Sequence, residues 1–449
     1  MAASTLFFAE ALLPAGWARG VRIDITDGCI TEITVDAEPA GERHGVGLPG
    51  LPNLHSHAFQ RGMAALAEVR GTAEDSFWSW REVMYRFLGA LTADDVEAIA
   101  ALAYAEMLEA GFTRVAEFHY LHHQPDGRAY ADPGEMAGRV IAAAEATGIG
   151  LTLLPVLYAH GNFGGAAATP GQRRFINSTD GYAALIERAR TQLAPLPDAV
   201  LGTAPHSLRA VTPEQLAHAV GLAEGGPVHI HAAEQMREVE DCLAWSGARP
   251  VQWLLEHGLG AGWCVVHATH MTAAETAGLA HSGAVAGLCP ITEASLGDGI
   301  FEGVGYLAAG GRYGIGTDSN IQITAAGELR QLEYSQRLTT RRRNVLAGAG
   351  ATTGRSLFAA ALAGGAAALG TTAGIAVGVS ADLVALETTH PSLIGRSGDG
   401  WLDGWIFASA AGADTVWRRG RKVVQHGRHF ARERIERDYR RTLNRLMSL

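Results

Sequence analysis

The chain has 449 residues, of which 47% are hydrophobic and 18% charged, a globular composition that excludes a disordered or fibrous protein. Its formal net charge of -10 argues against general affinity for nucleic acid or for an anionic membrane surface. The four cysteines show no CxxC spacing, and the N-terminal stretch lacks the basic region of a secretory leader. We therefore expect a cytoplasmic protein without structural disulfides.

Short strands are predicted at both ends of the chain. Residues 21–35, VRIDITDGCITEITV, alternate apolar and polar side chains around Asp27-Gly28, which indicates a β-hairpin. The segment ADLVALE and the apolar runs around Arg419-Gly420-Arg421 have the same character. We expect residues 1–47 and 375–430 to form one composite small β-sandwich domain, and residues 431–449 to form a charged amphipathic helix.

Between these ends, over residues 48–374, short apolar runs alternate with helical stretches expected near 92–110, 133–147 and 180–195. Such alternation predicts βαβ units and a parallel sheet, and eight of them fit an α/β (β/α)8 TIM barrel. The expected strands lie in LPGLPNLHSH, RVAEFHY, LTLLPVLYAH, AVLGTAPHS, PVHIHAAE, CVVHATH, AVAGLCP and RYGIGTDS.

One stretch without charged residues, 356–381, has the length of a membrane span. Its glycines, however, favour a helix of small residues, a turn and a short strand. We therefore expect no membrane partner.

Metal-ligating residues stand where several of the barrel strands are expected to end. The HSH motif carries His55 and His57, and their i, i+2 spacing puts both imidazoles on one side of a strand. His231 ends the fifth strand and Asp318 ends the eighth. Because the carboxyl ends of barrel strands meet at one face, these four residues can hold one divalent ion, expected to be Zn²⁺, with a position open for water.

Two further strand-end residues are suited to proton transfer. Glu234 follows His231 and two alanines after the fifth strand, and His267 ends the sixth strand. Taken singly, an HxH pair or a lone buried histidine is more often structural than catalytic. Their joint appearance, in the order that one barrel site requires, is what predicts a catalytic centre.

The motifs LPGLPNLHSHAFQR, HIHAAE, VVHATH and GIGTDS resemble the amidohydrolase superfamily, and the resemblance covers essentially the whole chain. It implies a metal-dependent hydrolase in which Glu234, His267 and Asp318 handle protons. Binuclear members bridge two metals through a carboxylated lysine after the fourth strand. Here that strand runs into TAPHSLR, and the only lysine is Lys422, outside the barrel. A single ion and the deaminase branch are therefore favoured.

Longer motifs, among them LHSHAFQRGMAALAE, SFWSWREVMY, VAEFHYLHH, APHSLRAV and HIHAAEQMREVEDC, closely resemble the formimidoylglutamate deiminase family. The resemblance implies hydrolysis of N-formimino-L-glutamate to N-formyl-L-glutamate and ammonia by a homodimer. It also implies that the substrate contacts are Gln60, Arg81, Tyr120, His206 and Arg209. Arginines suit a small-molecule substrate with two carboxylates, although any one arginine among 35 is more often a surface or ion-pair residue.

Two alternatives remain open. One is a deaminase of a flat ring amidine such as guanine or cytosine, or a chlorohydrolase, whose substrates do not need paired arginines. The other is a non-catalytic scaffold on the same fold, in which gaps among the ligands would be expected. Trp78 and Trp80 flank Arg81 in an expected aromatic loop, and we interpret them as packing residues. We interpret His119, His122 and His123 as loop or packing residues.

Overall fold

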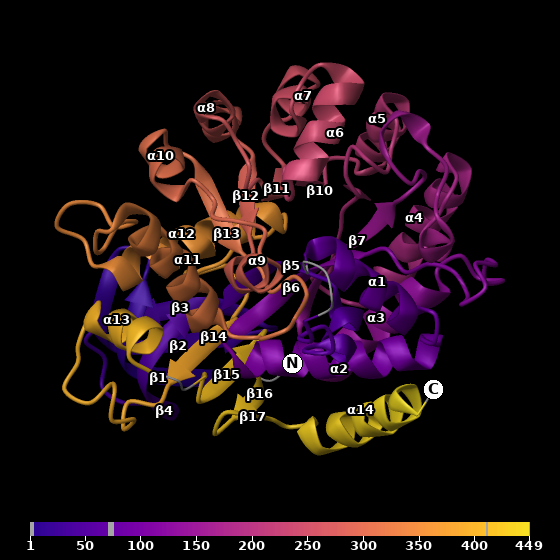
Figure 1. Ribbon diagram of the computed structural model, residues 1–449. Helices are drawn as coiled ribbons and strands as arrows, with labels where there is room; N and C mark the ends of the chain where they lie inside the picture. Colours follow the sequence, from indigo (N-terminus) through magenta and orange to yellow (C-terminus); the bar gives the residue numbers. More distant parts are fainter. Residues whose placement is uncertain (1–3, 71–75, 410–411, 449) are drawn as a thin grey trace.

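Strands from both ends of the chain share one mixed sheet in the computed structural model, which describes residues 4–70, 76–409 and 412–448 (Figure 1). The sheet has eight strands in the order β17-β16-β15-β14-β4-β1-β2-β3. Antiparallel pairing of β4 with β14 joins the N-terminal strands to the C-terminal ones. The strands are β1 Ser4–Leu13, β2 Gly16–Thr26, β3 Cys29–Thr34, β4 Glu42–Pro49, β14 Leu383–Leu386, β15 Thr415–Arg418, β16 Arg421–Gln425 and β17 Arg428–His429.

The two turns expected from the sequence form tight hairpins. Asp27 and Gly28 have φ values of 52° and 85°, and Arg419 and Gly420 have φ values of 50° and 69°. Positive φ at both central residues defines the turn that suits the twist of a two-residue hairpin. The turns also touch each other, because the Arg419 guanidinium donates to the carbonyl oxygen of Asp27 at 3.0 Å.

Parallel strands between the chain ends form two further sheets. One runs β5-β6-β7-β8 with β9 beside β7, and the other runs β10-β11-β12-β13. Parallel bridges join the two sheets on both sides, from Ser56 to Asp318 and from Ser207 to His231. The strands are β5 Leu51–Ser56, β6 Phe112–His119, β7 Gly150–Leu157, β8 Val200–Leu201, β9 Ala204–Pro205, β10 Val228–Ala232, β11 Trp263–His267, β12 Val285–Leu288 and β13 Arg312–Ile315.

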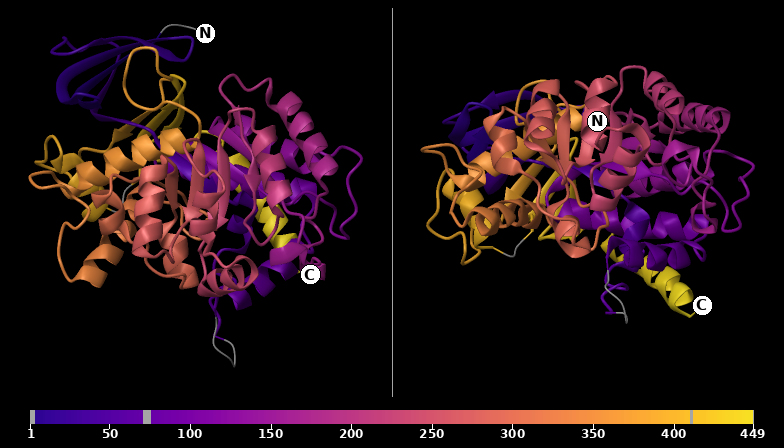
Figure 2. Two further views of the ribbon diagram at one scale, coloured as in Figure 1. Left: turned by 90° about the horizontal axis from the view of Figure 1, so that it is seen from above. Right: turned by 45° about the horizontal axis from the view of Figure 1, so that its top comes forward.

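Helices lie outside these parallel strands (Figure 2). The helices predicted near 92–110, 133–147 and 180–195 are confirmed as α2, α3 and α4. The α-helices are α1 Phe77–Leu88, α2 Ala93–Glu109, α3 Glu135–Thr147, α4 Thr179–Leu193, α5 Pro213–Leu222, α6 Met236–Ser246, α7 Pro250–Glu256, α8 Ala273–Ser282, α9 Pro290–Leu296, α10 Gly303–Ala308, α11 Ala325–Thr340, α12 Thr353–Ala368, α13 Gly400–Phe407 and α14 Arg432–Met447. Short 3-10 turns cover Ala58–Met63, Phe163–Gly165 and Pro170–Gln172.

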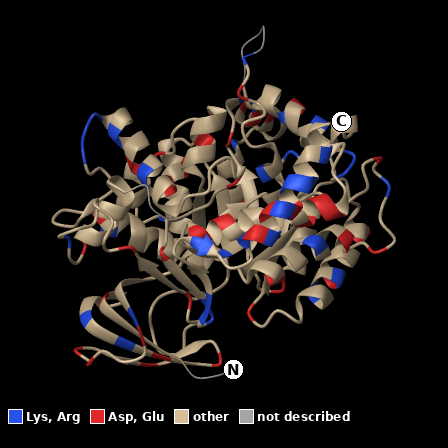
Figure 3. Ribbon diagram, turned by 90° about the horizontal axis from the view of Figure 1, so that it is seen from below, with Lys and Arg blue, Asp and Glu red and all other residues tan. Residues whose placement is uncertain are grey.

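The C-terminal helix α14 lies against α2 and carries charges of both signs (Figure 3). Arg432, at the start of α14, pairs with Glu109, at the end of α2, at 2.8 Å. Arg445, near the end of α14, pairs with Asp95, near the start of α2. The side chains of Ile435 and Leu446 in α14 are buried and belong to the apolar core. The predicted C-terminal helix is therefore present, within residues 432–447.

Two local expectations were wrong. The aromatic segment around Arg81 was expected as a loop but forms α1, whose start is capped by the Ser76 hydroxyl accepting from the Trp78 amide. The stretch 356–381 contains most of α12 but no strand, and the next strand is β14. Glycines are needed in α12 for close packing, since a Cβ on Gly364 would lie 1.9 Å from the carbonyl oxygen of Tyr313. Among the described residues, no helix combines the length and the apolar character that crossing a bilayer requires.

Candidate active site

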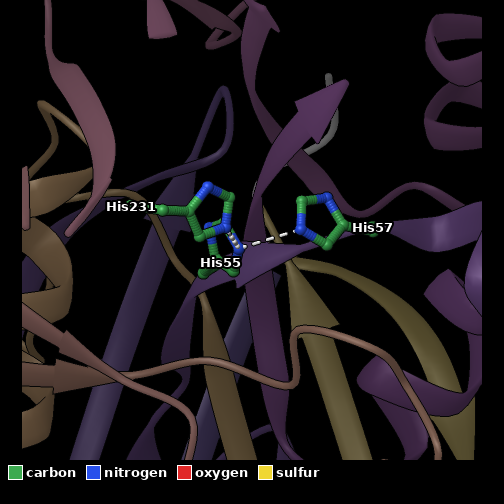
Figure 4. Close-up of side chains that lie close together, drawn as sticks. All are labelled: His55, His57 and His231. Carbon is green, nitrogen blue, oxygen red and sulfur yellow. Dashed lines mark hydrogen bonds between the residues drawn. The ribbon is translucent and has the colours of Figure 1, made fainter. Parts of the chain in front are cut away.

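Three imidazoles, those of His55, His57 and His231, converge at the ends of the parallel strands (Figure 4), and the carboxylate of Asp318 lies beside them. The Nε2 atom of His55 lies 3.2 Å from Nε2 of His57 and 3.1 Å from Nε2 of His231. Oδ1 of Asp318 lies 3.5 Å from Nε2 of His55 and 3.3 Å from Nε2 of His57. Separations of this size are those of neighbouring ligands around one tetrahedral ion with bonds of about 2 Å.

The other ring nitrogens orient two of these histidines. Nδ1 of His57 lies 2.9 Å from the carbonyl oxygen of Phe118, and Nδ1 of His231 lies 3.0 Å from that of His206. A carbonyl accepts only a donated proton, so Nδ1 carries the hydrogen and Nε2 keeps a free lone pair. Burial also lowers the pKa of all three rings, that of His55 to about 3. Neutral imidazoles with converging lone pairs fit a divalent metal ion.

His267 lies beside this cluster and touches three carboxylates. Its Nε2 is 3.7 Å from Oε1 of Glu234 and 3.8 Å from Oδ2 of Asp318, and its Nδ1 is 3.3 Å from Oε1 of Glu293. Burial alone would lower the pKa of His267, but these negative charges raise it well above its usual value. His267 is therefore a buried imidazolium held by acids.

Two of these acids, Glu234 and Asp318, differ in protonation. Burial raises the pKa of Glu234 to about 7, so near neutral pH this side chain can both give and take a proton. Burial would also raise the pKa of Asp318, but the hydrogen bond with His55 and the positive charge of His267 hold it below its usual range. Asp318 is thus an anion, and Glu234 is poised between its two forms.

Unusual backbone conformations occur at these strand ends. Ala233, His267, Ala268 and Asp318 have φ values of 53°, 67°, 49° and 44°. Non-glycine residues adopt the left-handed region at a cost of roughly 1–3 kcal/mol each, and such residues gather at functional sites. Here the sharp turns bring side chains from β10, β11 and β13 to the same point.

A cavity beside the cluster is lined by every residue expected to contact substrate, namely Gln60, Arg81, Tyr120, His206 and Arg209. Five of the six residues predicted for metal binding or proton transfer also line it, namely His57, His231, Glu234, His267 and Asp318, whereas His55 does not.

Several polar atoms in the cavity wall lack a protein partner. Gln60 donates to the Tyr120 hydroxyl at 2.9 Å, but its own amide oxygen accepts no hydrogen bond from the part of the chain that the structure describes. The Nε atoms of Arg81 and Arg209 are buried and donate to nothing among the described residues. Buried polar groups in proteins are almost always satisfied, so these atoms are available to bind a polar ligand.

Some wall residues were not expected from the sequence. Trp80 was interpreted as packing but lines the cavity, together with Tyr85 and Tyr158. Tyr158 follows directly after β7, so the strand-end argument applied to the histidines would have found it. The ring of Tyr158 lies 4.5 Å from that of His206, and its hydroxyl accepts from Gln172 at 2.8 Å.

The neighbouring histidines after β6 have packing roles, as expected. Nε2 of His122 lies 2.9 Å from the carbonyl oxygen of Val156, and Nε2 of His123 lies 2.7 Å from that of Ile176. His119 is buried beside His122, with ring centroids 5.4 Å apart.

Comparison with known proteins identifies the class. The model of the amidohydrolase family matches residues 46–423, and the chain belongs to this family. A second model, described as formimidoylglutamate deiminase HutF, N-terminal domain, matches residues 4–45. The chain is 53% identical, over 99% of its length and 100% of the relative's, to formimidoylglutamate deiminase from Pseudomonas aeruginosa. Within the family, the chain therefore falls in the formimidoylglutamate deiminase group.

Other relatives and solved structures agree on the fold. 8-Oxoguanine deaminase from Pseudomonas aeruginosa is 30% identical over 70% of this chain and 71% of its own. The crystal structure of an amidohydrolase from Brucella melitensis has a TM-score of 0.96 and 55% identity, covering 99% of this chain and 100% of that one. An adenosine deaminase from Xanthomonas campestris with bound zinc, at 22% identity, has a TM-score of 0.80 and covers 99% of this chain and 98% of its own, and so shares the fold alone.

Proposed function

We propose that this protein hydrolyses N-formimino-L-glutamate to N-formyl-L-glutamate and ammonia, using one divalent metal ion, Zn²⁺ in the first instance. The 53% identity to a formimidoylglutamate deiminase over nearly the whole chain supports the reaction. The observation that carries the substrate is the cavity itself. It is lined by a cluster of imidazoles and acids and also by Arg81 and Arg209, whose Nε atoms have no hydrogen-bond partner among the described residues.

We also infer that β5 to β13 form one closed (β/α)8 barrel. The parallel bridges at both joins between the two sheets support this closure. Closure explains why side chains from β5, β10, β11 and β13 reach a single point, since the carboxyl ends of barrel strands share one face. The boundaries of the composite small domain at 47 and 375, and its description as a sandwich, stay predictions.

The ion would be held by His55, His57, His231 and Asp318. When bound, it supplies Lewis acidity that lowers the pKa of a coordinated water toward about 7. The donor set supports this assignment, because three neutral imidazoles and a carboxylate suit zinc and related divalent ions.

We assign proton transfer to Asp318 and Glu234. Water adds to the formimino carbon, and the carbon–nitrogen bond to the terminal nitrogen breaks. Both water protons end on that nitrogen, which leaves as ammonium when the substrate enters as an amidinium. Asp318, an anion, takes one proton from the attacking water, and Glu234, with its pKa near 7, passes protons to the leaving nitrogen. The His267 imidazolium stabilises negative charge developing on the attacking oxygen.

We assign substrate recognition to other polar residues that line the cavity. Arg81 and Arg209 would bind the two carboxylates, because a guanidinium matches a carboxylate with two hydrogen bonds. Gln60, Tyr120 and His206 would complete the contacts, and the free amide oxygen of Gln60 offers an acceptor for the formimino nitrogen. The homodimer and the cytoplasmic location are further predictions, and light scattering after size-exclusion chromatography tests the first.

The deciding experiment compares ammonia release from N-formimino-L-glutamate, guanine and cytosine by the zinc-loaded protein. We expect release from the first substrate only. A folded, metal-containing protein that releases no ammonia from formiminoglutamate would overturn the proposal. A folded protein that retains no metal and gains no activity with added zinc would instead favour a scaffold.

A further inference from the structure

A second group of metal-ligating side chains lies beside the first. One ligand atom each of His267, Cys289 and Asp318 lies within 4.8 Å of the others, and all three residues are buried. Cys289 comes directly after β12, at the start of α9. The proposed reaction gives this thiol no role.

Asp318 faces both groups with different oxygens. Its Oδ1 lies 3.3 Å from Nε2 of His57, in the first group, while its Oδ2 lies 3.8 Å from Nε2 of His267, in the second. One carboxylate can therefore serve two ions at once, one through each oxygen. The two sites would be neighbours that share this single residue.

The surroundings of the second group favour a cation. Glu234 and Glu293 lie 3.7 Å and 3.3 Å from the His267 ring nitrogens. Thiolate and imidazole ligands select soft or borderline ions such as Zn²⁺ and Cd²⁺ over Mg²⁺ or Ca²⁺. A buried cysteine is commonly a small apolar filler. Cys264, also fully buried, has that character, because it belongs to no such group in the described part of the chain.

We propose that His267, Cys289 and Asp318 form a second site for a thiophilic ion, and that its occupation inhibits the enzyme. Binding forms a metal–sulfur bond as the Cys289 S–H bond breaks and a metal–nitrogen bond as the His267 imidazolium loses one ring proton, and both protons leave to solvent. The same ion takes the ring of His267 and one oxygen of Asp318, which the proposed reaction needs free. The inhibition rests on that proposed function, but the binding does not.

The test measures metal content and sulfur ligation directly. Protein with its resident ion is equilibrated with excess CdCl₂ and desalted, and zinc plus cadmium per chain is measured by plasma mass spectrometry. Wild type should hold two ions per chain, show an ultraviolet cadmium–thiolate charge-transfer band and lose most of its activity. Cys289→Ala should hold one ion, show no band and keep its activity in cadmium. Cys264→Ala, a matched loss of a buried thiol, should behave as wild type.

Two results would overturn the site: wild type holding one ion without a thiolate band at saturating cadmium, or Cys289→Ala retaining both the second ion and the band. If the alanine variant does not fold, Cys289→Ser preserves the side-chain volume, and the wild-type measurement decides without any variant. Neither the metal count nor the band requires turnover. A protein inactive on formiminoglutamate would thus fail the proposed function and still report on this site.

Discussion

Replacing Arg209 with methionine separates a ligand-binding role from a structural one. Arg209 is 7% exposed, its Nε donates to nothing, and it forms no ion pair among the described residues. Burial would lower its pKa, but the negative charges of Glu238 and Glu234 raise it. The guanidinium is thus charged in the free protein, with few direct contacts to lose. Methionine keeps most of the side-chain volume, so we expect the thermal midpoint to change little.

The cost should appear when substrate binds. Removing one partner of a buried, hydrogen-bonded charge pair costs about 2–5 kcal/mol, because the other charge is left unpaired. At about 1.4 kcal/mol per factor of ten, kcat/KM for N-formimino-L-glutamate should fall roughly 30-fold to 4,000-fold. Arg81 remains in the Arg209→Met variant to bind the second carboxylate, which favours the lower part of this range.

A coupled assay for ammonia with two substrates checks the reasoning. Formamidine has the reacting group without carboxylates, so Arg209→Met should leave its hydrolysis nearly unchanged. Arg237→Met is the matched control, because the Arg237 side chain is 64% exposed and stacks on Trp78. A kcat/KM for formiminoglutamate within about threefold of wild type would refute the role of Arg209 in carboxylate binding. An equal loss on both substrates would refute it as well.

The remaining predictions concern the metal cluster and its acids. Glu234→Gln should retain the metal ion by mass spectrometry while kcat falls roughly 10²–10⁴-fold, and unchanged turnover would remove Glu234 from the proton path. Because burial raises the pKa of Glu234 to about 7, its acid form is lost as the pH rises through that value. A pH profile of kcat should therefore decline on the alkaline side, and the residual activity of Glu234→Gln should lack this limb. His231→Ala should lose both the ion and the activity, and metal bound at wild-type stoichiometry would contradict its role as a ligand. Chelation of wild type should lower the thermal midpoint, since an ion that binds only the folded chain stabilises it; an unchanged midpoint in protein shown to be metal-free would argue against this coupling.

The strand ends were predictable because two independent rules coincide there. Apolar runs such as VHIHA mark buried parallel strands, and barrel strands must place their carboxyl ends at one face. The meeting of His55, His231 and Asp318, far apart in sequence, follows from these rules without knowledge of any loop. The resemblance then added the substrate contacts, which no periodicity indicates.

Three residues that were not predicted lie on helices that follow the strands, and their positions depend on how these helices pack over the strand ends. Glu293 reaches His267 from α9, and nothing near it in sequence marks it as different from other acids. Trp80 and Tyr85 line the cavity because the aromatic segment is helical, and the expectation of a loop there concealed this. The Ser76 cap was the available signal, since a serine before such a run is typical of a helix start.

The charges of both signs that line the cavity would suit a linear amidine with two carboxylates better than a flat neutral ring. In the proposed complex, Asp318 and Glu234 would attract the cationic formimino group, and Arg81 and Arg209 would attract the carboxylates. A substrate entering in reverse would place like charges together, which costs several kcal/mol in a desolvated site. In the proposed complex the orientation of the substrate is therefore fixed before any bond changes, and a neutral ring would leave both guanidinium groups without an anion. On this proposal the selectivity rests on Arg81 and Arg209, because the metal cluster alone would accept either kind of substrate.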